Sequence, residues 1–135
     1  VPLEPVLSWK SRIIYLKNVA PDTPISYSGT FKTKRMSLIA TAAFGYADGF
    51  RRSFSNNAQV LVRGKRVPVV GRVTMDMTLL DVTEAPETQV GDEVVLIGAQ
   101  GREQIRVQEL AGWAGTSAYE IFCGISARVP RVNFA

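Results

Sequence analysis

The sequence predicts a small, mainly β domain, similar to a barrel or a sandwich, with one or two short helices near the carboxy-terminus. Two observations support this prediction. Short segments rich in β-branched residues alternate with turn signals along most of the chain, which is typical of barrels and sandwiches. Helical spacing of apolar residues begins only after residue 106. With 135 residues, of which 46% are hydrophobic, the chain is long enough for a single core.

The expected strands are apolar or β-branched runs bounded by turn residues. They are residues 8–19, 36–46, 58–73, 77–82 and 92–98. The run at 58–73 contains two short strands around Arg63, Gly64 and Lys65, because glycine favours the backbone geometry of a tight hairpin turn. An acidic loop with a proline separates the last two runs.

Two short helices and a final strand are expected after these runs. Val107 and Leu110 begin a set of apolar residues at helical spacing, which predicts helical turns at 107–115 and 117–125. The residues ARVPRV at 127–132 are expected to close the chain as a strand.

Positive charge is concentrated in one part of the chain. The net charge is +4, and the sequence pI is about 9.5. The span from Phe50 to Thr74 contains six basic residues and no acid. This excess favours an acidic partner, such as nucleic acid, a phosphate or a carboxylate ligand. The alternative is a solvated cationic hairpin surface.

The chain has no histidine and a single cysteine, Cys123. A Ser-His-Asp triad, an imidazole zinc site and a cysteine cluster are therefore excluded within this chain, and no metal site is expected. Cys123 precedes a glycine in an apolar context, so we expect a buried small hydrophobe. The lack of a leader-like start and of a disulfide partner favours a cytoplasmic location. The start at Val1 predicts a piece of a longer protein, and no apolar run is long enough for a membrane helix.

Without histidine, proton transfer must use tyrosine, acidic residues, lysine or cysteine. Tyr27, Tyr46 and Tyr119 lie in the motifs SYSGTF, GYADGF and SAYEIF. A glycine near a tyrosine allows close approach of the backbone to a ligand and lets the ring project from a turn. The alternative is a half-buried ring whose hydroxyl is hydrogen-bonded locally. Asp48, in the same motif as Tyr46, is expected to shape its turn by accepting backbone hydrogen bonds.

Six motifs, in order and at compatible spacing, are similar to those of one family. They are PVLSWKSRI, SYSGTF, GYADGF followed by two arginines, VPVVGRVTMDM, VGDEVVLIG and YEIFCGISARVPR. They resemble the carboxy-terminal domain of alanine racemase across nearly the whole chain. The resemblance implies that residues 1–135 are the β-rich second domain of a fold-type III pyridoxal-phosphate enzyme. The family's amino-terminal α/β barrel, whose lysine forms a Schiff base with pyridoxal phosphate, is then absent from this chain.

The resemblance also implies a homodimer with shared active sites. The barrel of one subunit is covered by the β domain of the other, and a lysine and a tyrosine act as bases on opposite faces of the substrate alanine. The motif SYSGTF matches the position of the tyrosine base, so this catalytic role is carried to Tyr27. A phenol with an ordinary pKa of about 10 is a poor base at neutral pH, so positive charge from the barrel must assist it. We therefore expect the chain alone to be inactive.

Further site residues follow from the same resemblance. The backbone N–H of Met75 is expected to bind the substrate carboxylate by a charge-assisted hydrogen bond. Family members often have cysteine in place of Thr74, which should matter little because the main chain makes the contact. Tyr46 is expected to narrow the substrate entryway and to border the substrate-binding pocket, and Tyr119 to hydrogen-bond the cofactor phosphate. Asp76 either positions the loop around Met75 or lines the entryway. The other entryway residues are Arg52 and Arg72.

Alternatives to this assignment remain open from the sequence. Related racemases for serine or for a broader range of amino acids, and fold-type III decarboxylases, share the same two-domain plan. A β-barrel nucleic-acid binder would use the basic span, with Phe50 and Phe54 as its positions for base stacking. A purely structural dimerisation domain is the last alternative. We expect no nucleic-acid partner and no membrane partner.

Overall fold

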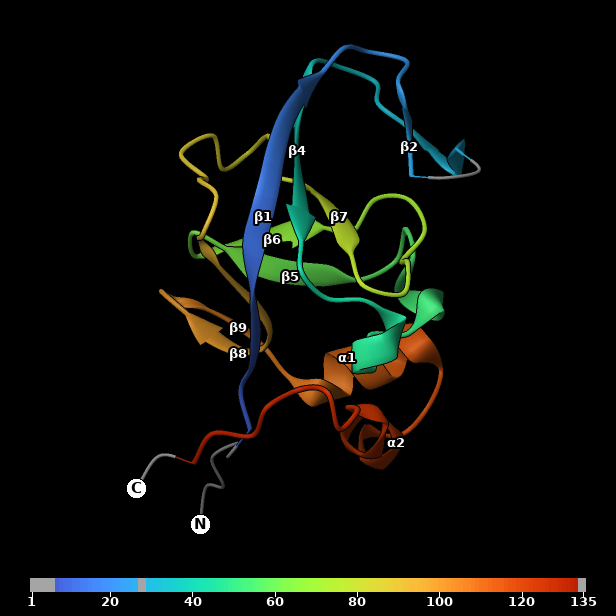
Figure 1. The fold of residues 1–135 in the computed structure, drawn as a ribbon, viewed down its shortest axis with the longest axis vertical. Coiled ribbons are helices and arrows are strands. Elements are labelled where there is room, and N and C mark those ends of the chain that lie inside the picture. The colour runs from blue at the N-terminus through green and yellow to red at the C-terminus, as the bar shows by residue number, and fades with distance from the viewer. Residues whose placement is uncertain (1–6, 27–28, 134–135) are drawn as a thin grey trace.

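The structure is a computed structural model that describes residues 7–26 and 29–133. Most of its regular elements are strands, and two short α-helices follow them, as the sequence predicts (Figure 1). The strands are β1 (Trp9–Val19), β2 (Pro24–Ile25), β3 (Phe31–Lys32), β4 (Ser37–Ala42), β5 (Gln59–Val62), β6 (Lys65–Pro68), β7 (Thr78–Asp81), β8 (Glu93–Gln100) and β9 (Glu103–Ile105). The helices are α1 (Val107–Ala114), α2 (Ala118–Gly124) and the 3-10 helices η2 (Tyr46–Asp48) and η3 (Arg52–Phe54). None of the helices in the described part of the chain has the length and apolar character needed to cross a membrane.

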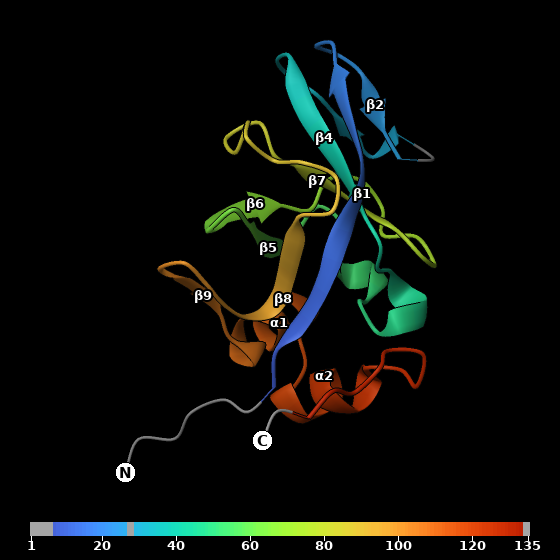
Figure 2. The ribbon, with the colours of Figure 1, turned by 60° about the vertical axis from the view of Figure 1, so that its left-hand side comes forward.

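One antiparallel sheet contains seven of the strands. Its order is β6-β5-β8-β1-β4-β7, with β9 paired to β8, while β2 and β3 form a separate pair. The long strand β1 joins the two halves, because its first residues pair with β8 and its later residues pair with β4. The edge strands approach each other at an isolated bridge between Val69 and Leu80 (Figure 2). Within the described ranges the sheet therefore curls, but a full ladder does not close it into a barrel.

The core lies between the curled sheet and the helices. Phe50 is near its centre, with ring centroids 4.8 Å from Phe44 and 4.6 Å from Phe54. Leu110 of α1 and Ile121 of α2 belong to the same cluster, so the two helices cover one end of the sheet (Figure 1). Each buried side chain of this size contributes about 1.5–3 kcal/mol. This packing fixes the loops that lead from the sheet to the candidate site.

The predicted hairpin turn is confirmed at Arg63 and Gly64. β5 and β6 pair on either side of these two residues. Both residues have positive φ, 54° and 74°, which is the geometry of a two-residue type I′ turn. Arg63 donates hydrogen bonds of 2.8 and 3.2 Å to the Asp92 carboxylate, which anchors the turn to the loop before β8.

The predicted strand at 127–132 is wrong. After α2 the chain makes a turn and then continues without regular structure. Arg131 donates hydrogen bonds of 2.5 to 2.8 Å to the carbonyls of Ile125, Ser126 and Val129, so its side chain closes this turn. Pro130 has no N–H for a sheet ladder. The segment thus satisfies its backbone groups locally rather than by strand pairing.

Cys123 is exposed, so its predicted burial is wrong. In α2, Ile121 is the residue buried against the core, and Cys123 comes two positions later. Side chains two positions apart on an α-helix lie on nearly opposite faces. The apolar context of Cys123 in the sequence therefore did not place it in the core.

Arg66 joins the sheet to the helical end of the domain. It pairs with Glu103 of β9 at 3.1 Å and with Glu109 of α1 at 2.8 Å. The hydrogen bond with Arg66 lowers the pKa of the Glu109 carboxyl, and the same bond raises the pKa of the Arg66 guanidinium. The pair thus stabilises the folded domain while Glu109 is ionised.

Candidate functional site

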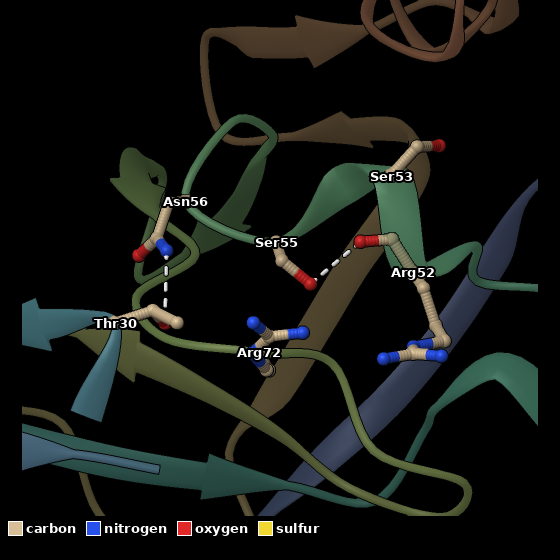
Figure 3. A pocket seen from close by; sticks show the side chains of 6 residues that line it. All are labelled: Thr30, Arg52, Ser53, Ser55, Asn56 and Arg72. Carbon is tan, nitrogen blue, oxygen red and sulfur yellow. Dashed lines mark hydrogen bonds between the residues drawn. The ribbon is translucent and has the colours of Figure 1, made fainter. Parts of the chain in front are cut away.

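A pocket of about 390 Å³ lies where three segments of the chain meet. One segment follows residues 27–28, the second is η3 with the turn after it, and the third follows β6. Figure 3 shows the side chains around the pocket, with the guanidinium groups of two arginines directed into the same space. The lining residues are Thr30, Arg52, Ser53, Ser55, Asn56 and Arg72.

Asn56 and Ser55 hold these segments together. Asn56 has a φ of 55°, in the left-handed region that asparagine tolerates better than most residues. Its amide group donates to the Thr30 hydroxyl at 3.2 Å, and its carbonyl oxygen accepts from the Gly71 N–H at 2.6 Å. The Ser55 hydroxyl accepts from the Val73 N–H at 2.8 Å. The sequence interpretation missed both residues, although an asparagine pair in a turn between basic residues is a signal for left-handed backbone.

The pocket is positively charged. Arg52 and Arg72 line it without an acidic residue, and neither forms an ion pair within the described part of the chain. The Nε atom of Arg72 is buried and has no hydrogen-bond partner among the described residues. The two guanidinium groups without an acidic partner make the pocket favourable for an anion, and a carboxylate or phosphate oxygen is a suitable acceptor for them. The pocket therefore suits a small anion.

Tyr27 lies outside the described residues, but its neighbours on both sides contact the pocket segments. The Ser26 hydroxyl donates to the Arg72 carbonyl at 3.1 Å. Gly71 has a φ of 76°, and a methyl group there would lie 2.7 Å from the Cβ of Ser26. On the other side, Thr30 lines the pocket. Both flanks of Tyr27 are thus held at the pocket.

The turn around Tyr46 and the loop around Met75 are bonded to each other. The Tyr46 N–H donates to the Thr74 carbonyl, and the Ala47 N–H to the Met75 carbonyl, both at 3.0 Å. A methyl group at Gly45 would lie 2.2 Å from the Thr74 oxygen, so glycine is required for this close approach. No hydrogen bond among the described residues uses the Met75 N–H, which leaves this donor for a ligand.

The Thr74 hydroxyl closes the loop in which Met75 lies. It donates to the Met77 carbonyl at 2.9 Å and accepts from the Met77 N–H at 3.2 Å. The side chain at this position therefore shapes the loop, a role that the argument from the Met75 backbone alone did not identify.

Asp48 and Asp76 both bind Arg128. Arg128 donates from Nε to Asp48 at 2.8 Å and from Nη2 to Asp76 at 2.7 Å. The hydrogen bond with Asp76 and the charge of Asp48 raise the pKa of the Arg128 guanidinium. The second Asp48 oxygen accepts from the Gly45 N–H at 2.9 Å, which confirms that Asp48 shapes its turn. The sequence interpretation missed Arg128, because its partners are distant along the chain and no local pattern connects them.

Tyr119 projects from the first turn of α2 and is 81% exposed. Within the described ranges, no hydrogen bond involves its hydroxyl or that of Tyr46, which is 45% exposed. The local hydrogen bonding considered from the sequence is therefore not found for these two tyrosines in this part of the chain. Next to Tyr119, Glu120 pairs with Arg51 at 3.6 Å. The hydrogen bond from the Thr116 hydroxyl, and to a smaller extent the charge of Arg51, lowers the pKa of the Glu120 carboxyl.

The aromatic residues of the basic span are buried. Phe50 is 1% exposed and Phe54 is 0% exposed, so neither can stack on a nucleic-acid base. The basic span thus presents arginines without the aromatic positions that a single-stranded nucleic-acid surface needs. Across residues 7–26 and 29–133, no group of three or more cysteine or acidic side chains could hold a metal ion.

The geometry defines the class of protein: a β domain with a pocket for a small anion. Residues 6–133 match the family model "Alanine racemase, C-terminal domain", and the chain belongs to this family. It is 57% identical over 131 residues to the alanine racemase of Halothermothrix orenii, covering 97% of this chain and 35% of that protein. The chain therefore spans about a third of the length of the relatives that it matches.

Two solved structures have the same fold over nearly the whole chain. The alanine racemase of Bacillus anthracis with bound L-Ala-P is 46% identical, with a TM-score of 0.93, covering 98% of this chain and 33% of that one. The alanine racemase of Bartonella henselae with covalently bound pyridoxal phosphate is 29% identical, with a TM-score of 0.87, covering 93% of this chain and 34% of that one. The family resemblance drawn from the six motifs is thus confirmed.

Proposed function

We propose that this chain is the carboxy-terminal domain of a pyridoxal-phosphate-dependent racemase that interconverts L- and D-alanine. The acid-free pocket with Arg52 and Arg72, which borders both flanks of Tyr27, is the observation that carries the proposal. α-Proton transfer on an amino acid needs a site for the carboxylate close to a proton-transfer group. The names of the relatives described above support alanine as the substrate.

Tyr27 is the proposed base on one face of the substrate. Its Oη takes the α-proton from L-alanine and returns a proton in the reverse direction. An unperturbed phenol keeps its proton at neutral pH, so nearby positive charge must favour the ionised form. This charge is expected from the barrel domain.

Other residues of the chain bind and guide the substrate in this proposal. The Met75 N–H, which has no partner among the described residues, donates to the substrate carboxylate. Arg52 and Arg72 attract that carboxylate into the entryway. Tyr46, whose N–H donates to the Thr74 carbonyl beside Met75, borders the substrate in this proposal, and Asp76 lies in the same loop at the entryway.

Tyr119 is the proposed contact of this chain with the cofactor. Its exposed hydroxyl suits a phosphate oxygen, since it makes no hydrogen bond within the described residues. When bound, pyridoxal phosphate draws electrons from the substrate α-carbon and makes its proton acidic. The Schiff-base lysine belongs to an amino-terminal barrel in this proposal.

Exposed apolar side chains near the site support contact with another domain. They lie on neighbouring segments, between 39% and 81% exposed, and are Tyr46, Met75, Met77, Tyr119 and Phe122. Such a group of apolar side chains at a site is typical of an interface. In our proposal the barrel of the second subunit of a homodimer covers them. A cytoplasmic location belongs to the same proposal, supported by the single cysteine of the chain.

The experiment that tests the proposal is a chimera in which this chain replaces the matching third of the Halothermothrix orenii alanine racemase. We expect the chimera, loaded with pyridoxal phosphate, to convert L-alanine to D-alanine in a chiral chromatography assay. The chain alone should show no conversion. Conversion by the chain alone, or a folded, cofactor-loaded chimera that converts neither enantiomer, contradicts the proposal. The ratio of kcat/KM for alanine to kcat/KM for serine tests the alternative of a racemase for serine or for a broader range of amino acids.

A further inference from the structure

Three segments of the chain meet at Arg128: the turn after α2, the turn at residues 45–49 and the loop at residues 74–77. The guanidinium group spans two carboxylates from different segments, Asp48 at 2.8 Å and Asp76 at 2.7 Å. It thus connects the turn that carries Tyr46 to the loop that carries Met75.

The backbone next to Arg128 is itself anchored. The Ser126 N–H donates to the Asp48 carbonyl at 3.0 Å. Gly49 packs closely on the end of α2, since a methyl group at this position would lie 2.4 Å from the Gly124 carbonyl oxygen. Arg128 therefore reaches the two carboxylates from a fixed support.

The two carboxylates differ in burial, and this difference separates two effects of Arg128. The Asp48 side chain is 13% exposed, and its two oxygens are bonded to Arg128 and to the Gly45 N–H. A nearly buried carboxylate needs such partners, so this contact stabilises the turn. The Asp76 side chain is 55% exposed and has no burial cost to offset. Its bond to Arg128 mainly fixes where the Met75 loop lies.

We propose that Arg128 is a positioning residue for substrate binding: by holding Asp48 and Asp76 together, it fixes the Met75 N–H relative to the Tyr46 turn. The inference rests on the proposed function, because it explains how the Met75 N–H is held in position to bind the substrate carboxylate. The planar fork of arginine can donate to two carboxylates in fixed directions, whereas the single ammonium of lysine cannot hold both in this geometry.

The first measurement uses this chain itself and does not depend on activity. Arg128→Lys keeps the positive charge and removes the fork. We expect amide hydrogen exchange at Tyr46 and Ala47, whose N–H groups donate to the Met75 loop, to become about tenfold faster. The matched control is Arg63→Lys, because Arg63 also donates two hydrogen bonds to a carboxylate, on the β5–β6 turn. Unchanged exchange at both amides in Arg128→Lys overturns the inference.

The second measurement uses the racemase chimera. We expect Arg128→Lys to raise KM for alanine about tenfold with little change in kcat, because a bond to the substrate carboxylate is weakened in the ground state and the transition state alike. Asp76→Asn should have the same effect on KM, and the double variant should add little, since both changes disrupt the same Arg128–Asp76 contact. A fall in kcat at constant KM, or fully additive effects, overturns the positioning role. An active parent chimera with an unaffected Arg128→Lys variant overturns this inference alone, whereas an inactive parent chimera overturns the proposed function.

Discussion

Gly45→Ala is expected to separate the Tyr46 turn from the Met75 loop. Gly45 has a φ of −161°, which any residue adopts, so the substitution adds no backbone strain. The new methyl group would lie 2.2 Å from the Thr74 oxygen and 2.6 Å from the Met75 carbonyl carbon and oxygen. Since such contacts are not observed below 3.0 Å, the two backbones must move apart by roughly 0.8 Å.

This displacement has a cost that can be worked from the contacts. The hydrogen bonds from Tyr46 and Ala47 to the Met75 loop are 3.0 Å long, and both exceed the usual limit after such a shift. Their loss is worth about 1 kcal/mol each. We therefore expect Gly45→Ala to lower the free energy of unfolding by about 2 kcal/mol, within the range of other overpacking substitutions. In the chimera, loss of the carboxylate contact should raise KM for alanine roughly 10- to 100-fold.

Urea unfolding of the chain and steady-state kinetics of the chimera measure these two effects. The control is Gly112→Ala in α1, where a methyl group meets nothing within 4 Å. Because alanine is the better helix former, this control should raise stability by about 0.5–1 kcal/mol and leave KM unchanged. The reasoning is refuted if Gly45→Ala leaves the unfolding midpoint and KM at their parent values.

Three further predictions concern the base, the carboxylate contact and the Arg66 pair. Tyr27→Phe in the chimera should abolish racemisation in both directions and selectively stop α-deuterium exchange from L-alanine in heavy water, followed by NMR; equal slowing for both enantiomers would show that Tyr27 only orients the substrate. Met75→Pro removes the backbone donor and should lower kcat/KM by the equivalent of about 1.5–3 kcal/mol, whereas Met75→Leu should change kcat/KM only slightly. Small, equal effects of the two substitutions would exclude a contact between the Met75 N–H and the substrate carboxylate. Glu109→Gln should lower the stability of the chain at pH 7 by about 1 kcal/mol, a modest value because the pair with Arg66 is partly exposed. The pKa of Glu109 is lowered in the folded state, so this stability is present above the ordinary glutamate pKa of about 4.3 and is lost as the pH falls through the folded pKa. The urea midpoints of the parent chain and of Glu109→Gln should therefore converge in acid.

Local patterns in the sequence were sufficient for the longer strands, the two helices and the positive charge of the pocket. The β-branched runs became strands, and Arg63 with Gly64 formed the expected hairpin turn, because both depend on neighbouring residues only. The span from Phe50 to Thr74 has no acid, and the pocket that it lines has none either. Arg51, Arg63 and Arg66 of this span pair with acidic residues from other segments, so the charge of the pocket depends on Arg52 and Arg72, which no acidic residue among the described residues reaches.

Side-chain burial near the site could not be read from composition. Phe50 and Phe54 stand among arginines in the sequence, yet they lie in the core. Cys123 stands among apolar residues and is exposed. Phe54 and Cys123 lie in helices of one or two turns, which have too few residues to show by periodicity which face meets the core, and Phe50 lies in the connection between η2 and η3, where no periodicity applies.

The sequence by itself determined the longer strands, the two helices, the absence of histidine chemistry and the family motifs in which Tyr27 and Met75 lie. Only the tertiary structure decided the strand order β6-β5-β8-β1-β4-β7, the close approach of Gly45 to the Met75 loop and the partners of Arg128. The physical reason is range: turn geometry and periodicity depend on residues next to each other, so they are visible in the chain. A guanidinium group reaches any carboxylate that folding brings near it, and that choice depends on the packing of the whole core.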